Sequence, residues 1–311
     1  GHGIYSDSTL NISGGTIENA QGGNGNYYGG HGIYSDSTLN ISGKAFIQNA
    51  KGGDGGTEGG SGIRSDSTLD ISDQASIQKA TGGEGKSSGS GNGGHGIYSK
   101  TMEILGGIIQ KAIGGNANGN TCTGGSGIHS DGTLTISGGE IQQATGGDST
   151  GISGKGGTGI RGDQVVKISG GAIGSAKGGI GGTGGAGIGG GKESTGATNI
   201  EITGDALVYA GSSGGAAIGS GESSTGETTI NIHDTNTGKG VKSAFAYGGA
   251  GIGSGRYAKG KTYVTIGNAS VSTLETPAAS TNTSGAGIGT GYGSQSDACL
   301  LYTSPSPRDP K

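Results

Sequence analysis

The hydrophobic residues of this chain recur in short alternating runs that are separated by long Gly-rich stretches. In residues 9–13, Leu10 and Ile12 alternate with Thr9 and Asn11, and a period of two is typical of a β-strand with one buried face. The same pair of aliphatic positions returns at Leu39/Ile41, Leu69/Ile71, Leu134/Ile136, Val166/Ile168, Ile200/Ile202, Ile230/Ile232 and Val264/Ile266. The pattern therefore predicts one half-buried strand in each copy.

A Gly-rich element ending in Ile precedes each of these strands. It occurs ten times, with its Ile at Ile4, Ile33, Ile63, Ile97, Ile128, Ile160, Ile188, Ile218, Ile252 and Ile288. We term these residues the marker Ile. A repeat of about 30 residues, in which each copy is too poor in apolar side chains to fold alone, indicates a solenoid whose coils bury one another.

A third extended stretch follows the second in most copies, with its inward residue at Ile17, Ile47, Ile77, Ile141, Ile173 and Leu207. In the fourth copy Met102, Ile104 and Ile109 each arrive one residue early, which predicts a one-residue deletion in the turn at residues 99–101. Gly is unfavourable inside helices. We therefore predict an all-β parallel β-helix of about ten coils, with three short strands per coil.

The composition alone would place the chain near the disordered class, because 80 of its 311 residues are Gly and 28% are hydrophobic. The repeat argues for a folded array instead. The net charge of −4 gives no basic surface for nucleic acid. No apolar run approaches the roughly 20 residues that cross a membrane, so we expect no membrane insertion within residues 1–298.

The two ends of the chain differ from the interior of the array. Residues 299–311 share nothing with the repeats, and Cys299 to Asp309 resembles a translated sequencing adapter. We therefore expect one β-helix array over residues 1–298 and a non-native tail over 299–311. Because Gly1 already lies within the repeat pattern, we expect both natural ends of the array to be missing.

The strings GHGIYSDSTLNISG, GAGIGGG and AAIGSG, placed before NIEITG, TINIHD and YVTIG, carry a family resemblance over residues 1–298. They resemble the Gly-rich repeats of large bacterial surface proteins with a pectin-lyase-like fold, including carbohydrate-binding and adhesin-like proteins. The resemblance implies a right-handed coil, an extracellular or cell-surface location, and polysaccharide as the partner.

The position after the marker Ile forms a candidate site. If Ile points inward, its neighbour points outward. We term the six residues Tyr5, Tyr34, Arg64, Tyr98, His129 and Arg161 the Tyr/Arg/His strip; the four later copies have Gly there. Such side chains stack against sugar rings and hydrogen-bond their hydroxyls, which predicts carbohydrate binding. The alternative is that they only cover an exposed sheet face.

Three further sets of residues repeat in register. Asp7, Asp36 and Asp66 would stack, so that Ca²⁺ could bridge them, unless each Asp hydrogen-bonds its own turn. We read His2, His31 and His95 as packed, stacked rings, and predict no metal ligands there. Asn19 and Asn49 predict a short internal amide ladder. We predict no cofactor and no metal ligands, with Ca²⁺ at the Asp residues as the less favoured alternative.

Catalysis is the less favoured alternative. A polysaccharide lyase of the pectate-lyase type could use Asp36, Asp66 and Arg64. However, an active site normally needs a cleft, which requires one coil to differ from the others, whereas the first five coils are alike. We therefore predict a non-enzymatic, adhesin-like module with no catalytic residues. A pure structural stalk is the other alternative.

Overall fold

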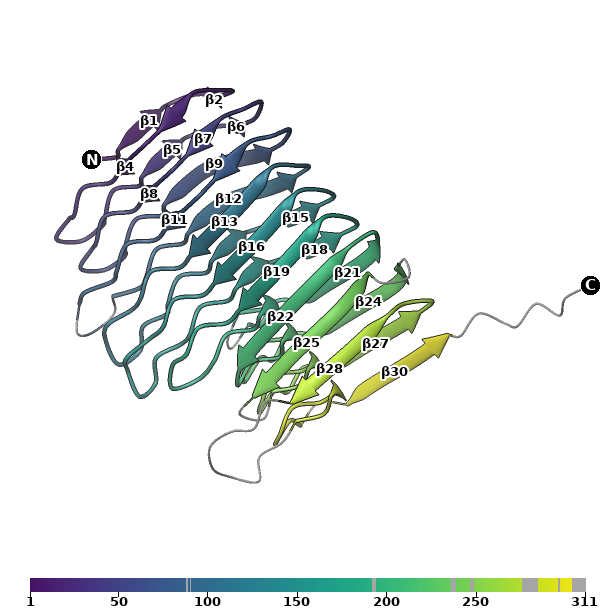
Figure 1. Cartoon of the computed structure of the whole chain (residues 1–311). Helices are drawn as coiled ribbons and strands as arrows, with labels where there is room; N and C mark the ends of the chain where they lie inside the picture. The colour runs from purple at the N-terminus through teal and green to yellow at the C-terminus, as the bar shows by residue number, and fades with distance from the viewer. Residues whose placement is uncertain are drawn as a thin grey trace, which may run out of the picture.

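The computed structural model describes residues 1–87, 89, 91–191, 194–235, 239–246, 249–275, 285–295 and 297–303 (Figure 1). All regular elements in these ranges are β-strands, and neighbouring strands pair in parallel. The chain winds through nine complete turns and the first two strands of a tenth. The predicted right-handed parallel β-helix is confirmed.

The marker Ile residues begin the first ladder of strands. They pair with one another in register from Ile4 to Ile288. The strands are β1 Ile4–Ser6, β5 Ile33–Ser35, β9 Ile63–Ile71, β12 Ile97–Ile104, β14 Ile128–Ser130, β17 Ile160–Gly162, β20 Ile188–Gly189, β23 Ile218–Gly219, β26 Ile252–Gly253 and β29 Ile288–Gly289.

The second ladder contains the alternating runs. Strands β9 and β12 continue into it, and the others are β2 Leu10–Ile12, β6 Leu39–Ile41, β15 Thr133–Ile136, β18 Val165–Ile168, β21 Thr198–Gly204, β24 Thr228–Thr235, β27 Thr262–Gly267 and β30 Ala298–Thr303. Met102 pairs with Leu69, and the register shifts between Ser99 and Thr101. The predicted deletion in this turn is therefore confirmed.

The third ladder closes each coil. Its strands are β3 Thr16–Ile17, β4 Ala20–Gln21, β7 Phe46–Ile47, β8 Ala50–Lys51, β10 Ser76–Ile77, β11 Ala80–Thr81, β13 Ile108–Ile113, β16 Glu140–Thr145, β19 Ala172–Lys177, β22 Leu207–Ser213, β25 Gly240–Ala246 and β28 Val271–Glu275. The prediction of Leu207 as an inward residue was wrong. Val208 pairs with Ile173 and is fully buried, because the preceding turn is one residue longer than in the coil before it.

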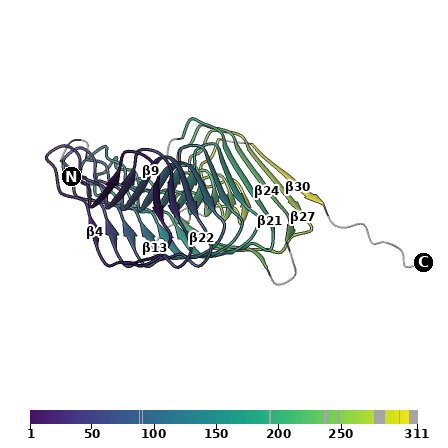
Figure 2. The same ribbon diagram turned by 90° about the horizontal axis from the view of Figure 1, so that it is seen from above.

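Each coil sends the same set of side chains into the interior. In the second coil Ile33, Leu39, Ile41, Ile47 and Ala50 are fully buried, and each lies on the equivalent residue of the next coil. Burial of one such aliphatic side chain is worth about 1.5–3 kcal/mol. Seen from above, the coils form one continuous stack (Figure 2).

The Gly-rich segments between the third ladder and the next marker Ile form an additional arm on the side of the coils, which we term the Gly-rich arm. The Gly pair that leaves the third ladder alternates along the axis with the Gly pair that returns to the marker Ile. The Gly30 amide donates to the Gly23 carbonyl at 2.8 Å, and the Gly53 amide of the next coil donates to Gly30 at 2.8 Å. We term this chain of bonds the glycine ladder; it continues through Gly60, Gly83, Gly94, Gly115, Gly125, Gly147, Gly157 and Gly179.

The glycine ladder requires residues without a side chain. A Cβ added at Gly60 would lie 1.9 Å from the carbonyl oxygen of Gly30, and one at Gly83 would lie 1.9 Å from that of Gly53. Both obstructing atoms belong to the backbone, so the clash cannot be relieved by moving a side chain. The high Gly content is therefore a packing requirement of this arm.

The end of the described chain also pairs with the array. In strand β30, Leu300 pairs with Val264 and Tyr302 with Ile266, although Leu300 and Tyr302 are 40% and 58% exposed. Residues 299–303, which we assigned to the tail, thus form part of a ladder here, and residues 304–311 lie outside the described part. The described residues include no helix long and apolar enough to span a membrane.

We expect Gly83→Ala to lower the free energy of unfolding by about 3 kcal/mol, the upper end of the usual cost of overpacking. Gly14→Ala is the matched control, because a Cβ at Gly14 meets no atom within 4 Å. Urea unfolding followed by circular dichroism measures both. Equal unfolding midpoints for the two variants would contradict the close packing of the glycine ladder.

Candidate functional site

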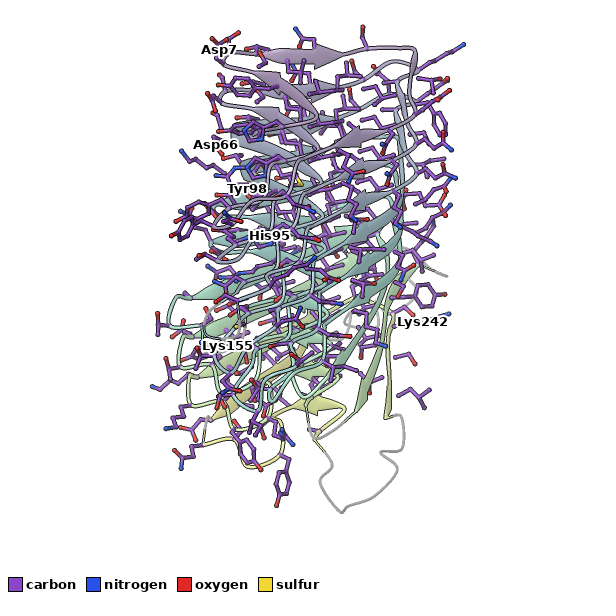
Figure 3. All side chains as sticks on the ribbon, turned by 90° about the vertical axis from the view of Figure 1, so that its left-hand side faces the viewer. Asp7, Asp66, His95, Tyr98, Lys155 and Lys242 are labelled. Carbon is purple, nitrogen blue, oxygen red and sulfur yellow. The ribbon has the colours of Figure 1, made fainter. Side chains whose placement is uncertain are left out.

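The Tyr/Arg/His strip is aligned by the marker ladder. Tyr5, Tyr34, Arg64, Tyr98, His129 and Arg161 pair in register in that order. Figure 3 shows Asp7, Asp66 and Tyr98 along one edge of the molecule, with Lys242 on the opposite side. The strip is not uniformly exposed, because Tyr5 is 53% exposed but His129 only 6%.

His129 lies in the outward register of the strip but is buried, which corrects its predicted exposure. Its ring lies 4.5 Å from that of His95 and 5.5 Å from that of Tyr98, so neighbouring rings cover it. The strip ends after Arg161 for a backbone reason. Gly189 has φ 126° and its three successors in the ladder have φ 135–139°, which is a conformation that residues with a Cβ rarely adopt.

The hydroxyl groups of the strip bond within the strip itself. Tyr5 donates to Asp36 at 2.7 Å, and Tyr34 donates to Asp66 at 2.9 Å. Each Tyr thus reaches the Asp of the next coil. The nearby Tyr34 hydroxyl and the hydrogen bond from Tyr5 hold the pKa of Asp36 below its usual value. The Tyr hydroxyls offset the repulsion between the stacked carboxylates. Binding of Ca²⁺ by Asp7, Asp36 and Asp66 stays a prediction.

Arg64 links three successive coils of the strip. Its Nε donates to Asp66 at 2.6 Å, and its guanidinium carbon lies 4.7 Å from the Tyr98 ring centre and 5.8 Å from that of Tyr34. Arg64 therefore covers part of two Tyr rings that we expected to face a ligand. The cation–π contacts fix the guanidinium between them.

In the first three coils, Ser stabilises the turn after the marker strand. The Ser37 amide donates to the Ser35 hydroxyl at 3.3 Å, and Ser35 itself donates to the Thr38 carbonyl. The expectation that Asp hydrogen-bonds its own turn was therefore wrong for this coil, since Asp36 accepts from the Tyr5 side chain instead. Ser35 can do this because it points inward and is fully buried.

The His residues are linked to the backbone of the following coil. The His31 amide donates to His2 Nδ1 at 2.9 Å, the Ser61 amide to His31 Nδ1 at 2.8 Å, and the Ser126 amide to His95 Nδ1 at 2.9 Å. A neutral imidazole that accepts at Nδ1 carries its hydrogen on Nε2. The rings of His2 and His31 stack at 5.0 Å, as predicted, and burial lowers the pKa of His31 to about 3.

The predicted amide ladder forms, but on the outer face. The Asn49 side-chain amide donates to the Asn19 side-chain carbonyl at 2.7 Å, and Asn19 is exposed. The prediction that this pair is internal was wrong, because both residues precede the inward Ala of the third ladder and so face outward.

A groove between the Gly-rich arm and the strip was missed by the sequence analysis. It is lined by His2, Tyr28, Gly29, His31, Tyr34, Glu58, Gly59 and Arg64. Tyr28 is 69% exposed and the adjacent Tyr27 is 72% exposed. Tyr28 forms a β-bridge with Glu58 in the next coil. The one signal in the sequence is this adjacent Tyr pair within a Gly-rich segment.

Comparison of the chain with protein-family models, curated proteins and solved structures gives no match. The fold is therefore defined by the coordinates, as a right-handed parallel β-helix. Membership of the bacterial surface family stays a prediction.

The buried His residues predict a pH dependence of stability. The folded-state pKa values of His31 and His95 lie below the value of 6.5 for an unperturbed His, so only the unfolded chain takes up protons at these positions as the pH falls from about 7 to 5. The free energy of unfolding should decrease over this interval, by up to about 1.4 kcal/mol per pH unit for each proton.

His95→Gln should flatten this dependence, because it removes one of these two buried imidazoles. Urea unfolding midpoints measured across the interval provide the comparison. Stability that increases on acidification would show that the buried imidazoles are not neutral.

Proposed function

We propose that this chain is a non-enzymatic, adhesin-like module of a bacterial cell surface, or a secreted one, that binds polysaccharide in the groove between Tyr28 and Tyr34. The observation that carries the proposal is the exposed Tyr28 ring beside polar groups of both kinds. Sugars are recognised by this combination, because their apolar ring faces pack on aromatic rings while their hydroxyls need donors and acceptors.

The groove offers both donors and acceptors. His31 has its hydrogen on Nε2, and the hydrogen bond of Arg64 to Asp66 uses Nε, which leaves the terminal nitrogens as donors within the described part of the chain. Glu58 supplies carboxylate oxygens. With both charges present, the groove fits a neutral or weakly charged sugar.

The shape of the groove favours a linear polymer. The outer edge of the Gly-rich arm forms a column parallel to the coil axis, in which Glu58 bridges to Tyr28 and Asn92, and Lys155 bridges to Thr123 and Thr183. The Tyr/Arg/His strip forms a second column with the same spacing of about 4.8 Å. A chain of sugars that lies in the groove parallel to the coil axis would contact both columns.

A binding role is also consistent with how the strip uses its carboxylates. Asp36 accepts from Tyr5, and Asp66 accepts from Tyr34 and Arg64. The groups that a lyase would use are thus engaged with one another, and they hold the strip as a rigid surface.

Tyr28→Ala should weaken binding about tenfold, which corresponds to 1.4 kcal/mol, because it removes the exposed aromatic wall. A panel of immobilised polysaccharides identifies the best glycan, and titration calorimetry with soluble fragments of it gives the dissociation constants. Tyr209→Ala is the matched control, since Tyr209 is 37% exposed on strand β22 of the third ladder.

Absence of binding to any glycan would overturn the proposal and favour a structural stalk. An equal loss of glycan affinity in Tyr28→Ala and Tyr209→Ala would also contradict it. Unsaturated sugar products that accumulate during the titration would instead identify a lyase.

A further inference from the structure

We propose that His129, Asp131 and Asp163 form a binding site for a late first-row divalent ion such as Zn²⁺. His129 lies in β14, Asp131 directly follows β14, and Asp163 directly follows β17 in the next coil. Among the described residues these three bring one nitrogen and two carboxylate oxygens within 4.8 Å of one another. The site is separate from the groove proposed above, and neither proposal depends on the other.

The separations fit metal ligands better than hydrogen-bond partners. His129 Nε2 lies 3.4 Å from Asp163 Oδ1 and 3.6 Å from Asp131 Oδ1. Both distances exceed the usual range of about 2.7–3.2 Å for a hydrogen bond. Ligands held about 2.0–2.1 Å from Zn²⁺ in tetrahedral geometry lie roughly 3.3–3.4 Å apart, which is close to both values.

The buried nitrogen is what distinguishes this cluster from an ordinary group of surface acids. His129 is only 6% exposed, and its Nε2 has no hydrogen-bond partner. A buried polar atom normally has a partner. Nε2 points toward the two carboxylates, so an ion between the three groups would provide that partner.

Neighbouring residues hold the ligands in place. Tyr98 donates to Asp131 Oδ2, and Arg161 Nε donates to Asp163 Oδ1, the oxygen that also faces His129. His129 Nδ1 lies 3.2 Å from His95 Nε2. Metal ligands in proteins are usually oriented by contacts of this kind.

The His contacts also select the type of ion. Because His95 accepts the Ser126 amide at Nδ1, its Nε2 carries a hydrogen that points at His129 Nδ1, and neutral His129 then carries its own hydrogen on Nε2. An ion must displace that proton to solvent. Zn²⁺ and similar ions bind imidazole nitrogen strongly, whereas Ca²⁺ and Mg²⁺ prefer oxygen ligands. We therefore expect the site to bind Zn²⁺ more tightly than Ca²⁺ or Mg²⁺.

Titration calorimetry of the full chain with ZnCl₂, CaCl₂ and MgCl₂ at neutral pH tests the proposal. We expect Zn²⁺ binding with release of a proton, detected as heats that differ between two buffers of different ionisation enthalpy. Asp163→Asn and His129→Gln should each weaken Zn²⁺ binding at least tenfold. His2→Gln is the matched control and should bind as the original chain does.

Zn²⁺ affinity that is the same in Asp163→Asn and in the original chain would overturn the proposal, as would the absence of any Zn²⁺ heat. Circular dichroism near 218 nm checks that each variant is folded. If the buried substitution His129→Gln unfolds the chain, Asp163→Asn decides the question, because the Asp163 side chain is 35% exposed.

Discussion

The close approach of backbone to backbone in the glycine ladder is the constraint on which the rest of the structure depends. Outgoing and returning segments of the arm interleave, and amides donate to carbonyls at 2.7–2.9 Å in alternation within and between coils. No residue with a Cβ fits between these segments. The arm therefore holds its coils together chiefly with backbone hydrogen bonds, whereas the three ladders combine backbone pairing with buried aliphatic side chains.

The positions of the candidate sites follow from the arrangement of the Gly-rich arm and the three ladders in each coil. The marker ladder directs the Tyr/Arg/His strip along one edge, and the arm lies beside it because the returning Gly pair leads directly into the marker Ile. The groove at Tyr28 and Tyr34 results from that adjacency. The strip itself is a network in which Tyr, Asp and Arg64 side chains hold one another in place.

The sequence was sufficient to predict the ladders, because a period of two and a repeat of about 30 residues determine which residues stack. The deletion near Ser99 was predictable for the same reason. The path of the Gly-rich arm was not, since residues without side chains carry no pattern of hydrophobic and polar positions. The groove depends on that path. The inward position of Val208, where we expected Leu207, depends on the length of one turn.

The in-register stacking has a consequence for how such an array changes over generations. Each coil contacts only its two neighbours through equivalent residues, and residues 2–14 are repeated without change at 31–43. Unequal recombination between such copies adds or removes one whole coil, and the surfaces on either side of the junction still match. The reach of the array and the length of its surface columns can therefore vary among descendants without any new packing having to arise.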